Sequence, residues 1–318
     1  MKKWLPVPLI TILVLVLAGI KIYSTYPEAV AALIPYNKET SSNVSIEKNA
    51  KKGSEAKIYK HRDIAKEKTF PFHTESEKQL AKKYPEQFNI VNKMYYSWDY
   101  IHNAQGKYSW GYPKREMSQA EFYVDFDHHK NRVTNKQYEN GKVVETTDVL
   151  FNRDIAISQR LEQKIYRKDT PKDPNYTNKE QFERDHIGLY NQWVTSSEWF
   201  SLLFNNYTNW DYQEGTQLGM PVYKMKGTIP STISESLQGR FTMVVSKDTG
   251  TLIDLKCYGQ EDRVIFFVTC EEIQINKGID PRVFNLDVSG HKQVSGREFG
   301  ERSVNNTTGT KSGGVDTR

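Results

Sequence analysis

Cysteine is scarce in this sequence, with two residues, Cys257 and Cys270, among 318. Small domains without a large core are usually held by several disulfides, so this count argues against a disulfide scaffold. Both cysteines lie in a predicted hairpin that turns at residues 259–262. If Tyr258 pairs with Arg263, the cysteines are about six residues out of register, roughly 20 Å apart at the rise of a strand. A disulfide cannot span that distance, and we predict two free, mostly buried thiols.

Recognisable catalytic motifs are also lacking, since no nucleophile elbow, HExxH zinc motif, phosphate-binding loop or dinucleotide glycine pattern occurs. Asp125, Asp127 and His129 alternate along a predicted strand and could hold a divalent metal. They have no fourth partner in the sequence and precede a polar turn, which favours a solvated strand end. Cys257 has no histidine near it in the sequence to activate it. We therefore predict no enzymatic activity, no cofactor and no metal site, with a hydrolase as an alternative.

An excess of one sign of charge is lacking as well. The chain has 44 lysines and arginines against 39 aspartates and glutamates. Lys2 and Lys3 supply two of the basic residues, which leaves 42 basic and 39 acidic groups in the rest of the chain. Nucleic-acid-binding domains carry a marked basic patch, so we predict no nucleic-acid partner.

Long hydrophobic runs are absent with one exception, Leu5–Ile20. Lys2 and Lys3 precede it, and basic residues stay on the cytoplasmic side of a membrane. The run has 16 residues, between the core of a cleavable signal and the roughly 20 residues of a transmembrane span. The stem of Lys21 can snorkel, which lets the helix continue to Tyr23. We predict a single-pass membrane anchor over residues 1–23, with the domain on the extracytoplasmic side.

Cleavage of this segment is the alternative. Ala29-Val30-Ala31 has the small-x-small pattern of a signal peptidase site, and cleavage near Ala31 would make the protein secreted. Leu17-Ala18-Gly19 would begin a lipobox, but Ile20 stands where the lipid-carrying cysteine is required, which argues against a lipoprotein.

Two polar stretches border the predicted domain. Residues 37–69 have few large apolar side chains and much Lys, Glu, Ser and Asn, which is typical of a disordered spacer, and we assign residues 24–73 to a flexible charged spacer. Residues 290–318 contain Gly, Ser, Asn and Thr with few apolar residues, which predicts a disordered tail. The folded domain is therefore expected over residues 74–289.

Periodicity within the domain predicts both helices and strands. Thr74 and Glu77 form a capping box, and apolar residues then recur at helical spacing over 75–102. Two further helices are expected at 179–193 and 197–204. Period-two patterns and turn residues predict an antiparallel meander, with strands at 120–126, 132–138, 143–148, 155–166, 210–213, 222–227, 240–246, 252–258 and 264–275.

This order of elements resembles the LolA/LppX/RseB-like superfamily of extracytoplasmic bacterial proteins. The local likeness lies in residues 219–227, 241–252 and 279–286, which are strand-and-turn patterns. The resemblance implies an α+β fold, in which a strongly curved antiparallel sheet forms an incomplete barrel with helices on its concave face. It also implies an apolar cavity, since relatives carry lipids or lipoprotein acyl chains, or sense envelope stress. An exported domain behind one N-terminal anchor with little cysteine is similar to proteins of Gram-positive bacteria.

Aromatic residues concentrate in the segment Trp193–Trp210. They either seal the core of the sheet or line a ligand cavity, because ligand pockets are mostly apolar and aromatic. The predicted lining is Trp193, Trp199, Phe200, Phe204 and Trp210, with Phe122, Val124, Phe126, Phe241, Met243 and Phe266 from the strands.

The sequence thus predicts a membrane-anchored, non-enzymatic binding domain for a lipid, a lipopeptide or an envelope protein, with the membrane itself as a partner through Leu5–Ile20. The alternative is a regulatory ectodomain that senses envelope stress. Since only about four residues would stay inside the cell, such an ectodomain would have to signal through another membrane protein.

Overall fold

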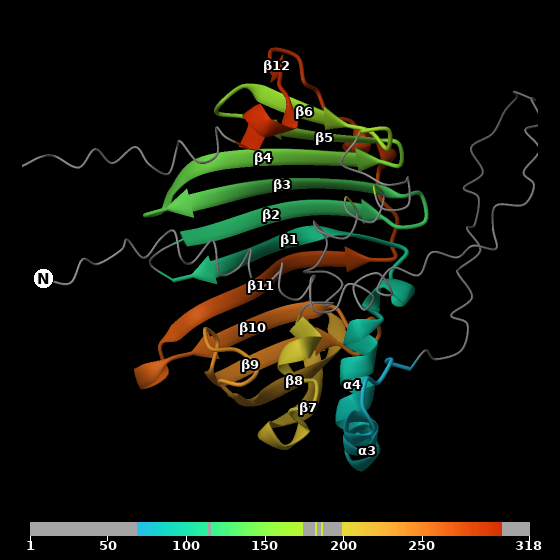
Figure 1. Ribbon diagram of the computed structural model, residues 1–318, viewed down its shortest axis with the longest axis vertical. Helices are drawn as coiled ribbons and strands as arrows, with labels where there is room; N and C mark the ends of the chain where they lie inside the picture. The colour runs from blue at the N-terminus through green and yellow to red at the C-terminus, as the bar shows by residue number, and fades with distance from the viewer. Residues whose placement is uncertain (1–68, 114–115, 174–181, 183–185, 187–198, 301–318) are drawn as a thin grey trace, which may run out of the picture. The chain divides into compact units, whose positions relative to one another are not determined.

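The computed structural model describes residues 69–113, 116–173, 182, 186 and 199–300, which belong to one structural unit, residues 61–318 (Figure 1). The predicted anchor, most of the predicted spacer and residues 301–318 lie outside the described residues. Among the residues described, none of the helices is long and apolar enough to cross a membrane.

The helical elements are short. They are α3 (Glu75–Lys83) and α4 (Pro85–Tyr95), with 3₁₀ turns η2 (Ser97–Tyr100), η3 (Trp199–Leu202), η4 (Tyr207–Asn209), η5 (Gln260–Asp262) and η6 (Pro281–Phe284).

The capping box is confirmed, because the Thr74 hydroxyl accepts from the Glu77 amide at 3.1 Å and the Glu77 carboxylate accepts from the Thr74 amide at 3.2 Å. The single predicted helix over 75–102 is wrong. Pro85 has no amide hydrogen to continue α3 and instead takes the first position of α4. The helix predicted over 197–204 is represented in the described residues by the 3₁₀ turn η3.

Twelve strands form one sheet (Figure 1). They are β1 (Asn103–Tyr112), β2 (Glu116–Asp125), β3 (Lys130–Glu139), β4 (Lys142–Asn152), β5 (Ile155–Arg160), β6 (Ile165–Asp169), β7 (Trp210–Gln217), β8 (Met220–Ile229), β9 (Gly239–Ser246), β10 (Leu252–Tyr258), β11 (Val264–Ile275) and β12 (Lys292–Gln293). Their spatial order is β12-β6-β5-β4-β3-β2-β1-β11-β10-β9-β8-β7. The short strand β12 runs parallel to β6, and the other neighbouring pairs are antiparallel.

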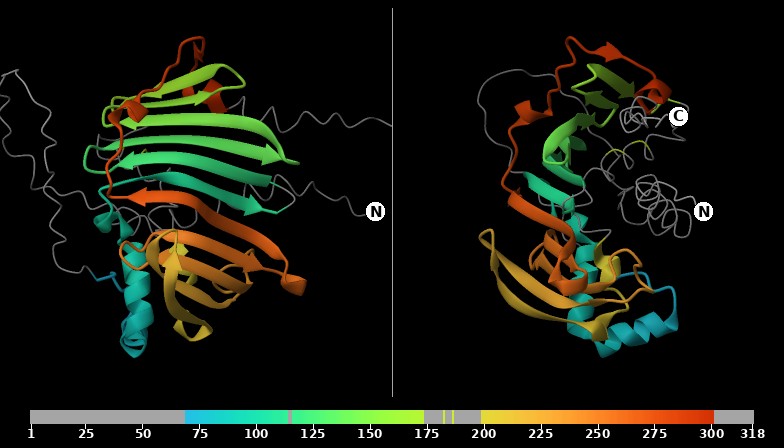
Figure 2. Two further views of the ribbon diagram at one scale, coloured as in Figure 1. Left: turned by 180° about the vertical axis from the view of Figure 1, so that it is seen from behind. Right: turned by 90° about the vertical axis from the view of Figure 1, so that its left-hand side faces the viewer.

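The sheet is open, which corrects the predicted incomplete barrel. Its edge strands, β7 and β12, stand at opposite ends of the strand order, and the sheet is not strongly curled. Each edge has its own neighbours. Tyr212 of β7 donates a hydrogen bond to Glu86 of α4 at 2.6 Å, and β12 is followed by a helical turn at 296–300 that packs beside β5 and β6 (Figures 1 and 2).

One face of the sheet carries the core, and we call it the inner face; it includes Phe122 and Val124 of β2, whereas Glu121 and Tyr123 lie on the outer face. Alternate residues of neighbouring strands continue the inner face into a large hydrophobic cluster. Val91 and Met94 of α4 are fully buried in the same cluster. The helices and the inner face therefore share one core.

A C-terminal segment runs from η6 to β12 and is fastened to the sheet by Arg132 of β3. The Arg132 guanidinium donates to the Val283 and Asn285 carbonyls at 2.9 and 3.0 Å and pairs with Asp148 at 2.8 Å. Val294 and Phe299 then pack with Ile165 of β6. Residues 292–300, placed in the tail by their composition, are thus part of the fold.

The prediction of two free, buried thiols is confirmed. The predicted hairpin register is wrong by about two residues, because Cys257 faces Phe266 and Tyr258 faces Val264. The cause is the turn, where η5 and a bulge between Cys257 and Tyr258 lengthen the connection.

Candidate binding site

Six aromatic side chains from three segments meet beside the β7–β11 half of the sheet. We call this group the aromatic layer; its members are Phe70, Phe72, Phe88, Tyr95, Phe200 and Phe204. The Phe70 ring is central, with ring centroids 4.5 Å from Tyr95, 5.7 Å from Phe200 and 4.4 Å from Phe204. Phe72 extends the layer, stacking on Phe88 at 5.3 Å. These distances are those of favourable aromatic pairs.

Local structure places each segment of the layer. Phe88 and Tyr95 are seven residues apart, about two turns of α4, so they lie on one side of it. The backbone amide of Phe70 donates to the Asn92 side chain at 2.8 Å, which holds the segment before α3 against α4. In the η3 region the Phe204 amide donates to the Phe200 carbonyl at 2.9 Å, which places these rings on the same side of that turn.

The aromatic layer has a buried centre and a half-buried margin. Phe70 and Tyr95 are 6% and 2% exposed. Four phenylalanines, Phe72, Phe88, Phe200 and Phe204, are half-buried. A contiguous group of partly exposed aromatic side chains is unusual on a soluble domain and marks a surface that can take up an apolar partner.

Three buried hydroxyl oxygens on or next to the segments of the layer have no hydrogen-bond partner among the described residues: those of Tyr95, of Ser97 just after α4, and of Tyr207, whose ring centroid is 6.4 Å from that of Phe204. Burial raises the pKa of Tyr95 to about 12, so its hydroxyl stays protonated at neutral pH. Unpartnered buried hydroxyls destabilise a fold unless water or a ligand satisfies them.

The η3 region also connects the layer to the inner face of the sheet. Trp199 stacks on Phe266 of β11 at 5.7 Å, and the Trp210 indole donates to the Leu203 carbonyl at 3.2 Å. Trp210, Phe241 and Phe266 lie in one row of cross-strand partners, which also contains Gly227 and Cys257.

The structure brings the described members of the predicted lining into one hydrophobic cluster. Trp199, Phe200 and Phe204 are partly buried against it. The buried members are Phe122, Val124, Phe126, Trp210, Phe241, Met243 and Phe266. Trp193 lies outside the described residues. Whether these side chains line a ligand cavity or only seal the core stays a prediction.

Sequence reasoning missed the other half of the aromatic layer. Phe70 and Phe72 precede the capping box and were included in the predicted spacer, and the pattern on α4 assigned Phe88 and Tyr95 to a core face. Two phenylalanines directly before a helix cap, as in Phe70-Pro71-Phe72, were the available signal, because large apolar residues are rare in true spacers.

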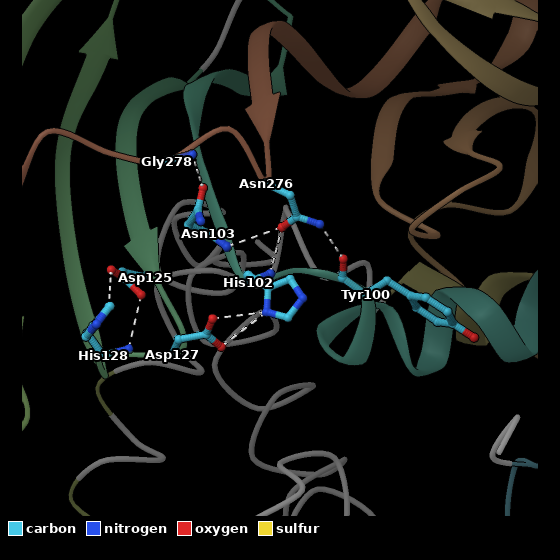
Figure 3. A network of polar contacts seen from close by, with 8 residues as sticks. All are labelled: Tyr100, His102, Asn103, Asp125, Asp127, His128, Asn276 and Gly278. Carbon is cyan, nitrogen blue, oxygen red and sulfur yellow. Dashed lines mark hydrogen bonds and ion pairs between the residues drawn. The ribbon is translucent and has the colours of Figure 1, made fainter. Parts of the chain in front are cut away.

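Two of the residues weighed as metal ligands, Asp125 and Asp127, contact different histidines (Figure 3). Strand β2 ends at Asp125, whose carboxylate accepts from the His128 amide and contacts the His128 ring at 2.7 Å. Asp127 instead pairs with the His102 ring at 3.0 Å. Among the described residues no group of three or more His, Cys, Asp or Glu could hold a metal ion.

The contacts around His102 fasten the ends of three strands to one another. The Asn276 side chain, just after β11, accepts from the His102 amide at 2.7 Å and donates to the Tyr100 carbonyl at 2.9 Å. Asn103 of β1 accepts from the Gly278 amide at 2.9 Å (Figure 3). We therefore interpret this cluster as structural.

A polar pocket of about 210 Å³ lies on the outer face, over β1, β2 and β11. Its lining consists of Gln105, Gly106, Glu121, Tyr123, Glu272, Ile273 and Gln274. Neighbouring side chains occupy its polar groups, since Gln105 bonds Gln274 at 3.0 Å and Lys107 pairs with Glu272 at 2.7 Å. Pockets for organic ligands are larger and mostly apolar, so the aromatic layer is the better candidate.

No protein-family model and no curated protein matches this sequence. Solved structures do match. The MucA/MucB complex of Pseudomonas aeruginosa aligns with 65% of this chain and 62% of that one, at 12% identity and a TM-score of 0.35. An uncharacterised conserved protein from Thermus thermophilus aligns over 67% of this chain and 99% of its own, at 9% identity and a TM-score of 0.36.

A LolA superfamily protein from Nitrosomonas europaea aligns over 63% of this chain and 97% of its own, at 8% identity and a TM-score of 0.22. The protein is therefore distantly similar in structure to MucB and to LolA-superfamily proteins. It spans about 62% of the MucB chain that it matches. At these identities the likeness concerns the fold alone.

Proposed function

We propose that this protein is a non-enzymatic binding domain that takes up the apolar part of a lipid, a lipopeptide or an envelope protein at the aromatic layer. In this proposal Leu5–Ile20 anchors the chain in the membrane and the domain works on the extracytoplasmic side. The aromatic layer carries the proposal, because four half-buried phenylalanines from distant parts of the chain converge there and continue into the core of the sheet.

The energetics of the margin favour an apolar ligand. Each methylene group that leaves water contributes about 0.8 kcal/mol. An acyl chain laid against Phe72, Phe88, Phe200 and Phe204 would also bury the exposed parts of these rings. Within the described part of the chain the buried hydroxyls of Tyr95 and Ser97 have no hydrogen-bond partner, and in this proposal they serve an ester or amide group beside the acyl chain.

The test uses the full-length chain. It is purified in mild detergent, exchanged into a polymer that leaves the domain accessible, and titrated with a short-chain diacyl lipid below its micelle concentration. We expect a saturable change in tryptophan fluorescence, since Trp199 and Trp210 belong to the cluster that the layer joins. Native mass spectrometry of the same sample should show an adduct of lipid mass that organic extraction removes.

A matched pair of variants localises the binding. Phe200→Ala together with Phe204→Ala should weaken lipid binding at least tenfold, because both rings contact Phe70 at the centre of the layer. Leu218→Ala removes an apolar side chain that is 42% exposed in the β7–β8 turn, and it should leave binding unchanged. Equal affinity in all three proteins would contradict the assignment of the site.

A protein that binds no lipid or lipopeptide would instead favour an envelope protein as the partner. Crosslinking in cells from a photoreactive residue at position 72 would then identify it. The same residue at position 218 provides the background.

A further inference from the structure

Strand β7 forms one edge of the open sheet, and no strand of the described residues lies beyond it (Figure 1). It has eight residues and pairs with β8 from Trp210 to Gln217 without a register shift. Edge strands are usually very short, bent by a bulge, or blocked by proline or lysine, because they offer unpaired backbone groups to other chains. The other edge strand, β12, has only two residues. β7 is longer and has no bulge, proline or lysine.

Pro221 of β8 shows which backbone groups of β7 are left unpaired. Its carbonyl accepts from the amide of Lys247, just after β9, at 3.0 Å, so the backbone of Pro221 points toward β9. In an antiparallel strand the N–H and C=O of one residue point to the same side, and successive residues alternate. Thr216, which faces Pro221, therefore directs its N–H and C=O away from β8.

Two further residues of β7 point the same way, because the register with β8 is continuous. They are Glu214 and Tyr212, which alternate with Thr216. The described part of the chain shows no hydrogen bond to the outward backbone groups of these three residues. Residues 212–216 span roughly 14 Å at the rise of a strand. The edge thus presents three donors and three acceptors at the spacing of a β-ladder.

The side chains of these residues leave the edge accessible. Glu214 and Thr216 are exposed, and Tyr212 is half-buried. The Tyr212 hydroxyl donates to Glu86 of α4, and its ring lies in the inner-face row that continues through Met225 of β8. An incoming strand would therefore meet the backbone of β7 without displacing a packed side chain.

The charges of β7 disfavour a second copy as the partner and favour a basic strand. β7 carries Asp211 and Glu214 and no lysine or arginine. Lysines stand behind these carboxylates, since Lys247 pairs with Glu214 at 2.5 Å and Lys226 of β8 faces Asp211. If two copies paired their outward residues about the middle one, the two Glu214 carboxylates would lie directly opposite each other, and such like-charge pairs are destabilising.

We propose that the β7 edge binds an extended, basic segment of a partner protein, which adds a strand to the sheet. The backbone of Tyr212, Glu214 and Thr216 supplies the hydrogen bonds of the new ladder. Asp211 and Glu214 supply the preference for lysine or arginine side chains. This inference goes beyond the proposed function, because it requires no apolar ligand and no contact with the aromatic layer.

The experiment uses the full-length chain in mild detergent, at constant ionic strength, with three fluorescently labelled peptides long enough to pair with residues 210–216. The first alternates valine with lysine. The second alternates valine with glutamate. The third is the lysine peptide with every backbone amide N-methylated, which removes its donors. By fluorescence anisotropy we expect the lysine peptide to bind at least tenfold more tightly than either of the others.

Two substitutions at one position separate the backbone from the side chain. Thr216→Pro removes an N–H that makes no bond to β8, and proline is tolerated at the edge of a sheet. Thr216→Val keeps the N–H and changes the side chain. Thr216→Pro should weaken binding of the lysine peptide at least tenfold while melting near the parent temperature, and Thr216→Val should bind it as the parent does. The N-methylated peptide tests the same bonds on the unaltered protein.

A second set of variants tests the preference for a basic strand. Asp211→Asn together with Glu214→Gln should reduce the difference in affinity between the lysine and glutamate peptides at least fivefold, because the carboxylates at the border are lost. Glu139→Gln removes an exposed carboxylate at the end of β3 and should leave that difference unchanged.

Each outcome decides between the alternatives. Failure of the lysine peptide to bind, equal binding of it by the two Thr216 variants, or undiminished binding of the N-methylated peptide would overturn the proposal. A dimer of the full chain in native mass spectrometry that Thr216→Pro dissociates would assign the edge to a second copy and also overturn it. Lipid binding at the aromatic layer should be equal in Thr216→Pro and the parent, so the proposed function is tested separately.

Discussion

At the scale of single residues, the two thiols are the most clearly predicted groups. Burial raises the pKa of Cys257 and of Cys270 to about 12, from an ordinary value of 9.0. The thiolate is the reactive form, so both cysteines should react with a disulfide reagent at pH 8 far more slowly than a free peptide thiol. The measurement is the rate of colour release from Ellman's reagent, with the denatured chain as the control that titrates two thiols. Rapid release from the folded chain would show that the thiols are accessible.

The same shifts set a dependence of stability on pH. Between pH 9 and 12 the thiols ionise in the unfolded chain and stay protonated in the folded one, so the free energy of unfolding falls as pH rises. Burial of Tyr95, with its pKa raised to about 12, acts in the same direction above pH 10. Below pH 9 these three groups contribute no slope. Urea titrations at pH 8 and pH 10.5 test the sign, and an unchanged or higher midpoint at pH 10.5 would contradict it.

Gly227 gives a third prediction at this scale, because it faces Trp210 across β7 and β8. A Cβ atom at this position would lie 2.2 Å from the Asn209 carbonyl oxygen and 2.5 Å from the Trp210 Cβ. Gly227→Ala should therefore lower the free energy of unfolding by about 1–3 kcal/mol through overpacking. Gly300→Ala is the control, since a Cβ there meets nothing within 4 Å. Chemical denaturation measures the free energy of unfolding of both variants. If both were as stable as the parent, β7 and β8 would accommodate the added methyl group without a loss of stability, which would contradict the prediction.

At the scale of elements, the C-terminal segment depends on Arg132. Its guanidinium joins Asp148, which is buried, to the carbonyls of Val283 and Asn285. Arg132→Ala leaves that carboxylate without its partner and should cost about 2–4 kcal/mol. It should also speed hydrogen exchange in residues 283–289 more than in β8. The control is Arg282→Ala, which removes an 89% exposed side chain and should change neither the stability nor the hydrogen exchange. A similar effect from both variants would mean that Arg132 does not hold the C-terminal segment.

Element boundaries could be predicted where local chemistry decides them. The bounds of β10 and β11 were predicted to the residue, and the Asn140-Gly141 turn has the positive φ angles, 50° and 75°, that these residues favour. Strand β1 was missed, because Gly106 and Gly111 interrupt its alternation. Its strand conformation comes from pairing with β2 and β11, which is tertiary and leaves no local pattern.

The candidate sites were predictable only in part, for the same reason. An aromatic-rich segment around Trp199 is visible in the sequence, and its described members pack against the hydrophobic cluster that contains the predicted strand residues. Phe70 joins it through contacts with Phe200 and Phe204, made across more than a hundred residues, and Phe72 follows through its contacts with Phe70 and Phe88. Arg160 of β5 and Arg167 of β6 contact the ring of Phe299, which comes from a stretch whose composition predicts disorder. Phe70-Pro71-Phe72 indicates locally that the spacer ends before the helix cap, but the partners of these side chains cannot be predicted from the local sequence.

At the scale of the whole molecule, the open sheet has two edges, and the last residues of the described chain cover one of them. β12 pairs with Ile165 and Tyr166 of β6, and Val294 and Phe299, 7% and 9% exposed, pack on Ile165. An uncovered edge strand offers its backbone groups to another chain. We therefore expect a chain that ends at Ser289 to be less stable than the full chain and to self-associate. A chain that ends at Gly300 should match the full chain in stability and in its oligomeric state.

The magnitude follows from the two buried side chains. Burying a valine and a phenylalanine contributes about 1.5–3 kcal/mol each, so ending the chain at Ser289 should lower the free energy of unfolding by about 3–6 kcal/mol. Denaturation curves measure that loss, and light scattering at two concentrations measures association. The control is a charged residue in place of Ile157, which is partly buried on β5 next to this edge. Because this variant keeps β12 in place, we expect it not to cause self-association. If the shorter chain stayed monomeric and equally stable, β12 and the 296–300 turn would not be needed for the stability of the fold or for covering this edge.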